Sequence, residues 1–178
     1  MKSSVISALE GHHPLFACEG TGEEVIISKL VEADALVFPK DHVVDITRKR
    51  KSTDIQSEYL GFEYDWPVCI VRVLDSLRER FHLGPLYADR FPVVSVHTRP
   101  EIEMLIIIRE GHFADYSKRK SSTKPSVYCK SAFGFRDVKS QPFLDDYWDA
   151  ESIVDAAIQY RRVAHLESDE LCLADLIK

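Results

Sequence analysis

The 178-residue sequence lacks the closely spaced cysteine pairs that mark zinc and redox sites. Its four cysteines, Cys18, Cys69, Cys129 and Cys172, stand far apart and form no C-x-x-C motif. Structural zinc sites and dithiol redox centres need such pairs or a matching histidine spacing. Two of the four lie in apolar, strand-like runs, so we expect buried free thiols rather than ligands or nucleophiles.

Long apolar runs are missing as well. No stretch approaches the roughly 20 apolar residues that span a bilayer, and residues 1–13 hold no apolar core of signal-peptide length. We therefore expect a cytoplasmic protein with no membrane contact.

Nucleotide-binding glycine motifs are also absent. The seven glycines form neither G-x-x-x-x-G-K-[ST] nor G-x-G-x-x-G, and the seven histidines show no H-E-x-x-H spacing. The formal net charge of −6 argues against a general nucleic-acid coat protein. A local basic groove remains compatible with that charge, because binding responds to the local field rather than to the sum.

The residues that are present describe a globular α/β protein. The composition is 45% hydrophobic and 29% charged, and the length suits one domain or one domain with an appended lobe. We expect residues 1–110 to form an α/β domain whose central sheet is mostly parallel, has about four strands and is flanked by helices. Residues 111–178 are expected to form a helical extension packed on that domain.

Apolar runs predict the strands of this sheet. The first of them, residues 15–18, shows no alternation, which is typical of a parallel strand buried on both faces. The predicted strands are residues 15–18, 35–38, 68–74 and 93–97. Thr21, with Glu24 three residues later, forms a capping-box pattern and predicts a helix that begins at Thr21.

Helices are expected to dominate the rest of the chain. Pro100 suits the first turn of a helix with Thr98 as its cap, and the apolar run from Met104 to Ile108 follows. From Gly111 onward we expect no further strands. The helices predicted there are residues 125–133, 151–162 and 170–177, and the aromatic segment 142–148 is expected to pack inward.

Carboxylates follow three of the predicted strands. Glu19 comes after the first, Asp75 after the third, and Glu101 and Glu103 after the fourth. Because the carboxyl ends of parallel strands lie along one edge of a sheet, these side chains converge if their strands are neighbours. Clustered oxygen ligands favour Mg²⁺ or Mn²⁺ and predict metal-assisted phosphoryl or phosphodiester chemistry. The alternative is that each carboxylate caps a helix and faces water.

This ordered set of residues resembles a known domain. An apolar strand ending at Glu19-Gly20, a helix, and a later apolar strand ending at Asp75 are similar to the Toprim domain of topoisomerases, primases and certain bacterial nucleases. Residues 99–105, RPEIEML, resemble the proline-containing acidic third motif of small stand-alone bacterial Toprim proteins, some of which occur in phage-defence loci. The resemblance covers roughly residues 14–110.

The resemblance implies a role for each carboxylate. Glu19 matches the family's glutamate, which acts as an acid or base or helps to bind metal. Asp75 matches the first aspartate of its D-x-D metal motif, and Glu103, with Glu101 as a further candidate, matches the acid of the third motif. The implied activity is that of a Mg²⁺- or Mn²⁺-dependent nuclease or related phosphotransferase.

One position departs from the family pattern. The second aspartate of D-x-D falls at Leu77, and Glu79 or Glu103 is the candidate replacement ligand. Arg78 or Arg99 is expected to neutralise phosphate charge. The second hypothesis, motivated by Leu77, is a catalytically degenerate module that binds nucleic acid or a partner protein. A phosphorylated small-molecule substrate is a third possibility.

A basic run is the candidate nucleic-acid contact. Arg48, Lys49, Arg50 and Lys51 are consecutive and precede a predicted helix over residues 52–60. Basic charge at a helix N-terminus opposes the helix dipole, and a bound phosphate backbone of DNA or RNA would relieve that cost. The alternative is a solvated helix start without a ligand. The oligomeric state is left open.

Overall fold

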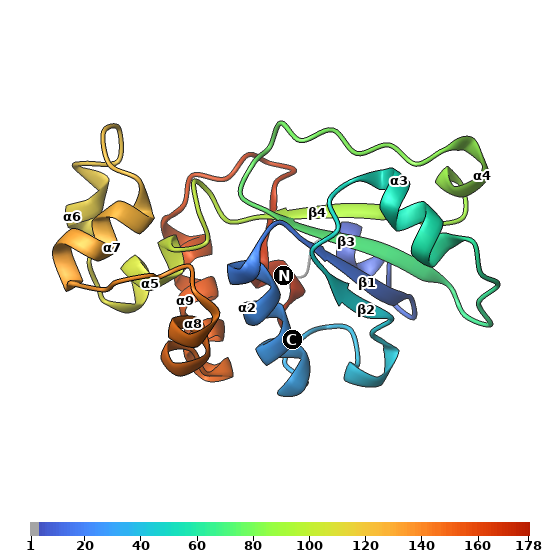
Figure 1. The fold of residues 1–178 in the computed structure, drawn as a ribbon, viewed down its shortest axis with the longest axis horizontal. Helices are drawn as coiled ribbons and strands as arrows, with labels where there is room; N and C mark the ends of the chain where they lie inside the picture. Colours follow the sequence, from blue (N-terminus) through green and yellow to red (C-terminus); the bar gives the residue numbers. More distant parts are fainter. Residues whose placement is uncertain (1–3) are drawn as a thin grey trace.

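A parallel β-sheet forms the centre of the computed structural model, which describes residues 4–178 (Figure 1). Its strand order is β2-β1-β3-β4-β5, and each of the four strand pairs is parallel. The strands are β1 His13–Cys18, β2 Asp45–Thr47, β3 Val68–Leu74, β4 Val93–His97 and β5 Leu171–Cys172. The predicted α/β fold with a mostly parallel sheet and flanking helices is confirmed, with five strands in place of about four.

The two central strands owe their position to their apolar sequences. All seven residues of β3 are buried, and so are the last five of β1. Their register pairs Phe16 with Val71 and Leu15 with Ile70. Because side chains alternate along a strand, the first pair faces the larger core cluster and the second pair faces the smaller one.

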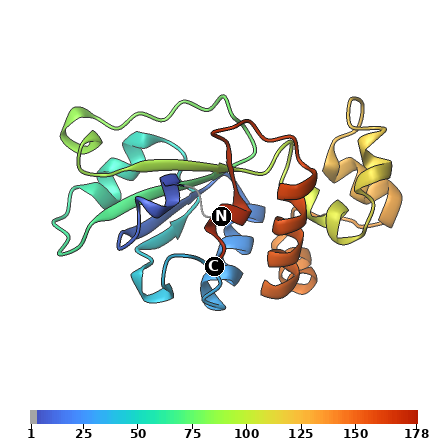
Figure 2. The ribbon, with the colours of Figure 1, turned by 180° about the vertical axis from the view of Figure 1, so that it is seen from behind.

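Helices cover the two faces of the sheet unequally (Figures 1 and 2). The larger core lies under α2 (Thr21–Glu32) and α9 (Ala150–Val163), together with the short helix α1 (Ser4–Ser7). The other face is covered by α3 (Ser52–Ile55), the π-helical turn η2 (Gln56–Leu60) and the long connection that contains α4 (Pro85–Ala88). Ile55 and Leu60 are buried beneath this layer.

Three short helices form an arm beyond the carboxyl end of the sheet, and Figure 1 shows it on the left. They are α5 (Met104–Arg109), α6 (Phe113–Ser117) and α7 (Pro125–Phe133), and the following helix α8 (Gln141–Tyr147) packs against α2. The apolar run Met104–Ile108 is wholly buried, so α5 anchors the arm. The helix α9 then returns along α5 and α2 to the sheet. No helix within residues 4–178 has the length and apolar character needed to cross a membrane.

The predicted strand over residues 35–38 is wrong. This segment contributes a single antiparallel bridge between Leu36 and Ile177. Its backbone bonds go to the end of the chain, since the Val37 N–H donates to the Leu176 carbonyl and the Lys178 N–H donates to the Ala35 carbonyl. The place beside β1 is taken instead by β2, after the turn η1 (Lys40–His42).

The predicted helix over residues 170–177 is also wrong, as is the expectation that strands end at Gly111. Leu171 and Cys172 form β5 and pair with Val96 and His97 of β4, and the 3-10 turn η3 (Leu173–Leu176) follows. The Asp175 carboxylate accepts the N–H of Cys172, the N-cap of η3, and so helps to cap that turn.

Two helices begin differently from what the sequence predicted. The helix α2 does begin at Thr21, but the capping box is not formed, because the Thr21 hydroxyl accepts a hydrogen bond from Arg48 and Gly20 is the N-cap. The helix expected at Pro100 begins at Met104. The Thr98 N–H still bonds to the Leu74 carbonyl of β3, so the chain leaves the sheet later than expected.

Candidate acidic site at the carboxyl end of the sheet

The site begins where β1 and β3 end side by side. Cys18 pairs with Val73, so Glu19 and Asp75 leave adjacent strands at nearly the same level. The Asp75 N–H donates to Glu19 Oε2 at 2.9 Å, and the Glu19 N–H donates to the Val73 carbonyl at 3.0 Å. Sheet pairing therefore positions both carboxylates before any ligand binds.

A cavity of about 320 Å³ gathers the charged groups around this pair. We call it the acidic cavity, and its charged lining comes from β1, α2, β3, the turn before α5 and the loop before α8. The charged residues are Glu19, Glu23, Asp75, Glu103 and Lys139. The structure thus brings together three of the carboxylates that the sequence singled out, together with two residues that it did not.

Glu23 is one of the two residues that the sequence analysis missed. It lies in the first turn of α2, is 6% exposed and lines the acidic cavity. Burial, assisted by the negative charges of Glu19 and Asp75, raises the pKa of Glu23. Its spacing of four residues from Glu19 was the available signal, because an acidic residue in the first helical turn points back toward the strand that precedes the helix.

Gly22 allows the third segment to approach. A β-carbon built at Gly22 would lie 2.7 Å from the Ile102 side chain, closer than real β-carbons come to another atom. The absence of a side chain lets the start of α2 lie directly against the turn that carries Glu103. This glycine is therefore a structural requirement of the acidic cavity.

Glu103 is the most deeply buried carboxylate of the cavity. It is 2% exposed, its Oε2 accepts no hydrogen bond from residues 4–178, and the Lys139 ammonium lies 3.8 Å from that oxygen. Burial raises the pKa of Glu103 to about 7. A buried carboxylate without a donor is costly, and a bound cation or proton relieves that cost.

Asp75 is perturbed in the same direction. Burial, the negative charge of Glu19 and a hydrogen bond with the Glu19 side chain together raise the pKa of Asp75 to about 6. Both shifts favour the uptake of a proton or another cation by the acidic cavity.

Lys139 and Glu101 connect the acidic cavity to the arm. The Lys139 Nζ lies 3.1 Å from Glu101 Oε1, and the other oxygen of Glu101 accepts the Ser126 N–H at 3.0 Å. Although burial raises it, these hydrogen bonds bring the pKa of Glu101 below its ordinary value. Glu101 thus anchors α7 rather than lining the cavity. Nothing in the sequence pointed to Lys139, because it lies 36 positions beyond Glu103 in a loop without a motif.

Arg50 links Glu79 to the cavity from outside. Its Nη2 lies 3.0 Å from Glu19 Oε1 and 3.0 Å from Glu79 Oε2, and Arg72 Nη2 lies 3.2 Å from the other oxygen of Glu79. Glu79, a candidate for the ligand missing at Leu77, is therefore held in ion pairs beside the cavity.

Most of the basic run is neutralised inside the molecule. Arg48 pairs with Glu24 at 3.2 Å and Lys49 pairs with Glu58 at 2.5 Å. Lys51 is exposed. Any nucleic acid that contacts this run therefore has to compete with carboxylates of the chain itself.

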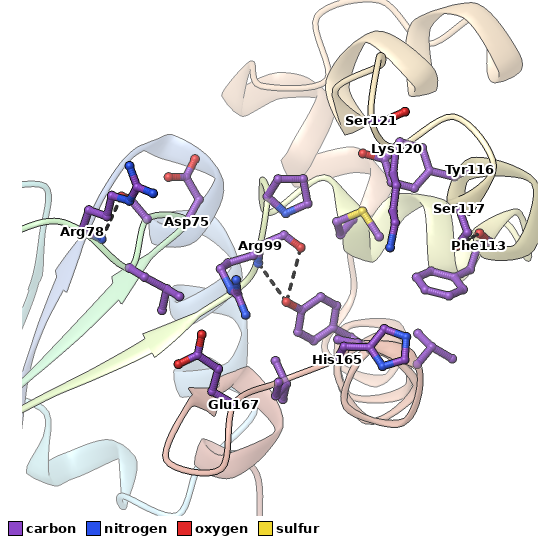
Figure 3. A pocket seen from close by; sticks show the side chains of 18 residues that line it. Asp75, Arg78, Arg99, Phe113, Tyr116, Ser117, Lys120, Ser121, His165 and Glu167 are labelled. Carbon is purple, nitrogen blue, oxygen red and sulfur yellow. Dashed lines mark hydrogen bonds between the residues drawn. The ribbon is translucent and has the colours of Figure 1, made fainter.

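A second, larger cavity adjoins the acidic one between the sheet and the arm (Figure 3). We call it the interlobe cavity; it has a volume of about 1010 Å³ and shares Asp75 with the acidic cavity. Arg78 and Arg99 both line it, as does the exposed side chain of Leu77. Arg99 forms a bidentate pair with Glu170, with N–O distances of 2.7 and 2.5 Å, whereas Arg78 forms no ion pair within residues 4–178.

The donor set fits a hard divalent cation that is held by few protein oxygens. Within residues 4–178, no group of three or more His, Cys, Asp or Glu side chains is placed so that it could hold a metal ion by itself. Mg²⁺ commonly uses one or two protein carboxylates and completes its shell with water and substrate phosphate. The adjacent carboxylates of Glu19 and Asp75 would supply those one or two ligands, and Glu103 lines the same cavity. The four buried free cysteines lie outside the cavity lining, and burial raises the pKa of their thiols.

Comparison of the chain with models of known families, with curated proteins and with solved structures finds no match in any of the three. The fold and the site define an α/β protein with clustered carboxylates at the carboxyl edge of a parallel sheet. What that site does has to be inferred from its own chemistry.

Proposed function

We propose that this chain is a Mg²⁺- or Mn²⁺-dependent nuclease of Toprim type that cleaves phosphodiester bonds in nucleic acid. The observation that carries the proposal is the convergence of Glu19, Asp75 and Glu103 in one cavity, with a buried Glu103 oxygen that accepts no hydrogen bond from residues 4–178. The same three residues match the family motifs that the sequence resembles. The interlobe cavity gives a polymer access to this site from the side of Asp75.

Each residue has a role that follows from its position. The metal ion, when bound, supplies stabilisation of negative charge on a phosphoryl oxygen and a more acidic water. Asp75 and Glu103 would hold the cation, with Glu23 in the place of the carboxylate absent at Leu77. Glu19, oriented by the Asp75 N–H, would accept the proton of the attacking water.

Two cationic side chains support the same chemistry. Lys139 points its ammonium at Glu101 and Glu103 from the arm and would attract the phosphate group to the cavity. Arg78 has no carboxylate partner within residues 4–178 and would neutralise a phosphate next to the scissile one.

A specific observation supports the second candidate, a degenerate module that binds nucleic acid or a partner protein. Arg50 and Lys139 already pair with Glu19 and Glu101, so part of the negative charge is balanced without a metal. Together with Leu77, this arrangement describes a site that has kept its shape without a full set of catalytic ligands.

A cleavage assay separates the two. Labelled DNA and RNA, single-stranded and duplex, are incubated with the protein in Mg²⁺, in Mn²⁺ and in EDTA. The nuclease proposal expects cleavage that requires metal and falls roughly 100-fold or more in Glu19→Gln and Asp75→Asn, because the general base and a metal ligand are removed. Glu63→Gln, at an exposed position away from the site, is the matched control and should retain full activity.

The other outcomes are equally informative. Binding that persists in EDTA without any cleavage supports the binding module. Cleavage that is equal in the wild type and in both site variants comes from a contaminant and contradicts the nuclease proposal. Absence of metal binding, nucleic-acid binding and cleavage contradicts the nuclease proposal and the nucleic-acid-binding form of the second candidate.

A further inference from the structure

The interlobe cavity has the size of a ligand pocket rather than of a flat surface. Its volume of about 1010 Å³ lies at the upper end of the roughly 300–1,000 Å³ that ligand pockets occupy. One wall consists of the strand-end segments 75–78 and 99–100, and the opposite wall consists of α6 with residues 120–121. The end of α9 and residues 164–167 close the third side (Figure 3).

Two unpaired cations face this cavity from opposite walls. Arg78 lies beside Asp75 at the sheet end, and Lys120 extends from the arm (Figure 3). Neither forms an ion pair within residues 4–178. Glu167 also lines the cavity, but its charge acts on Arg99, which is paired with Glu170. The cations at Arg78 and Lys120 are therefore available for phosphate groups.

The remaining lining suits a nucleobase. Met104, Val163 and Leu166 provide apolar surface, and Phe113 adds a half-buried aromatic ring. Ser117 and Ser121 bring hydroxyl groups to the same cavity. An apolar wall with an aromatic ring accepts the face of a base, and hydroxyl groups bond to its polar edge.

A base can enter such a walled space when it is unpaired. In a duplex each base is stacked and paired, and extruding it costs a few kcal/mol, whereas single strands and loops present splayed bases without that cost. A base in the interlobe cavity also brings a neighbouring phosphodiester to Asp75, the residue shared with the acidic cavity.

We propose that the interlobe cavity binds an unpaired nucleotide, so that the substrate of the acidic site is a single-stranded segment of nucleic acid. This inference rests on the proposed function for the identity of the reaction, but its binding step needs no catalysis. Arg78 and Lys120 hold the flanking phosphates, and Phe113 stacks with the base.

Binding is measured by fluorescence anisotropy in EDTA, with short labelled single strands of DNA and RNA and the corresponding blunt duplexes. We expect single strands to bind at least roughly tenfold more tightly than duplexes of equal length, since bases that are already splayed avoid the cost of extrusion. Arg78→Glu and Lys120→Glu should each reduce the slope of log affinity against log salt by about 0.7 for every phosphate that is no longer neutralised. Phe113→Leu, which keeps an apolar side chain, should weaken binding by roughly fivefold or more.

Matched controls exist for both charge reversals. Arg80→Glu, two residues after Arg78, and Lys130→Glu, on α7, reverse exposed charges outside the cavity lining, and both should bind single strands like the wild type. Equal or tighter duplex binding would overturn the inference, as would cavity variants that behave like their controls.

The two proposals can fail separately. Metal-dependent cleavage of duplexes without selective binding of single strands would overturn this inference and leave the nuclease proposal intact. Selective binding of single strands through Arg78 and Lys120 without cleavage in any metal would support the inference and favour the binding module over the nuclease.

Discussion

The burial of Glu103 predicts a pH-dependent loss of stability in the metal-free protein. Burial raises the pKa of this carboxyl from 4.5 to about 7 in the folded state. Between these two values the folded protein binds more protons than the unfolded chain does. The contribution of Glu103 to the free energy of unfolding must therefore fall as the pH rises from about 4.5 to about 7, and its full destabilising effect is present above pH 7.

The size of the effect follows from the same shift. One pKa unit corresponds to about 1.4 kcal/mol, so the ionised Glu103 costs the folded state about 3 kcal/mol at most above pH 7. The variant Glu103→Gln has no charge at this position and avoids the pH-dependent part of that cost. The difference in unfolding free energy between variant and wild type should change by roughly 2–3 kcal/mol in favour of the variant between pH 5 and pH 8.

Urea denaturation in EDTA at pH 5, 6, 7 and 8 measures this difference directly. Any constant cost of the buried amide cancels, because the prediction concerns the change with pH rather than the value at one pH. Glu63→Gln, an exposed control, should follow the wild type throughout. Parallel curves for the wild type and Glu103→Gln would refute the reasoning, since they would show that Glu103 is not desolvated in the folded protein.

Three further predictions concern the neighbours of the cavity. Arg50→Gln removes the cation that lies 3.0 Å from Glu19 Oε1, so Mn²⁺ affinity measured by calorimetry should rise several-fold; unchanged affinity would show that Arg50 does not compete with metal. Gly22→Val adds a side chain at a position where even a β-carbon would lie 2.7 Å from Ile102. The free energy of unfolding measured with urea should fall by about 1–3 kcal/mol, and cleavage activity should fall as well. Unchanged stability would contradict the close approach of Gly22 and Ile102. Leu105→Ala truncates a fully buried side chain of α5 and leaves a cavity in its place, so the free energy of unfolding should fall by about 2–5 kcal/mol. A fall of less than about 1 kcal/mol would argue against a firmly packed arm.

The central strands were predictable because their signal is local. β3 has the bounds that its apolar run indicated, and β4 does as well. Strands buried on both faces need continuous apolar residues, which a single sequence displays. The prediction that carboxylates after such strands converge followed from parallel geometry alone, and it placed Glu19, Asp75 and Glu103 on one cavity.

The errors came from segments whose structure is decided at long range. β5 has two residues, too few for a pattern, and it exists because β4 offers a free edge to Leu171 and Cys172. Residues 35–38 have the composition of a strand but bond to the C-terminal segment instead.

For the site, too, the sequence predicted the local features but not the long-range contacts. Carboxylates at strand ends can be found from the sequence, but Lys139 reaches them from a distant loop, and the partners of Arg50 depend on how β2 lies beside β1. Glu23 had a usable signal in its helical spacing from Glu19.

The central claim is that the strand-end carboxylates form a divalent metal site. Anomalous diffraction from crystals soaked in Mn²⁺ tests it most directly, with Asp75→Asn crystals as the control. We predict a peak in the acidic cavity at the carboxylate oxygens of Asp75 and its neighbours, and its loss in the variant. A wild-type crystal with no peak in that cavity, or with Mn²⁺ bound elsewhere alone, would contradict the claim.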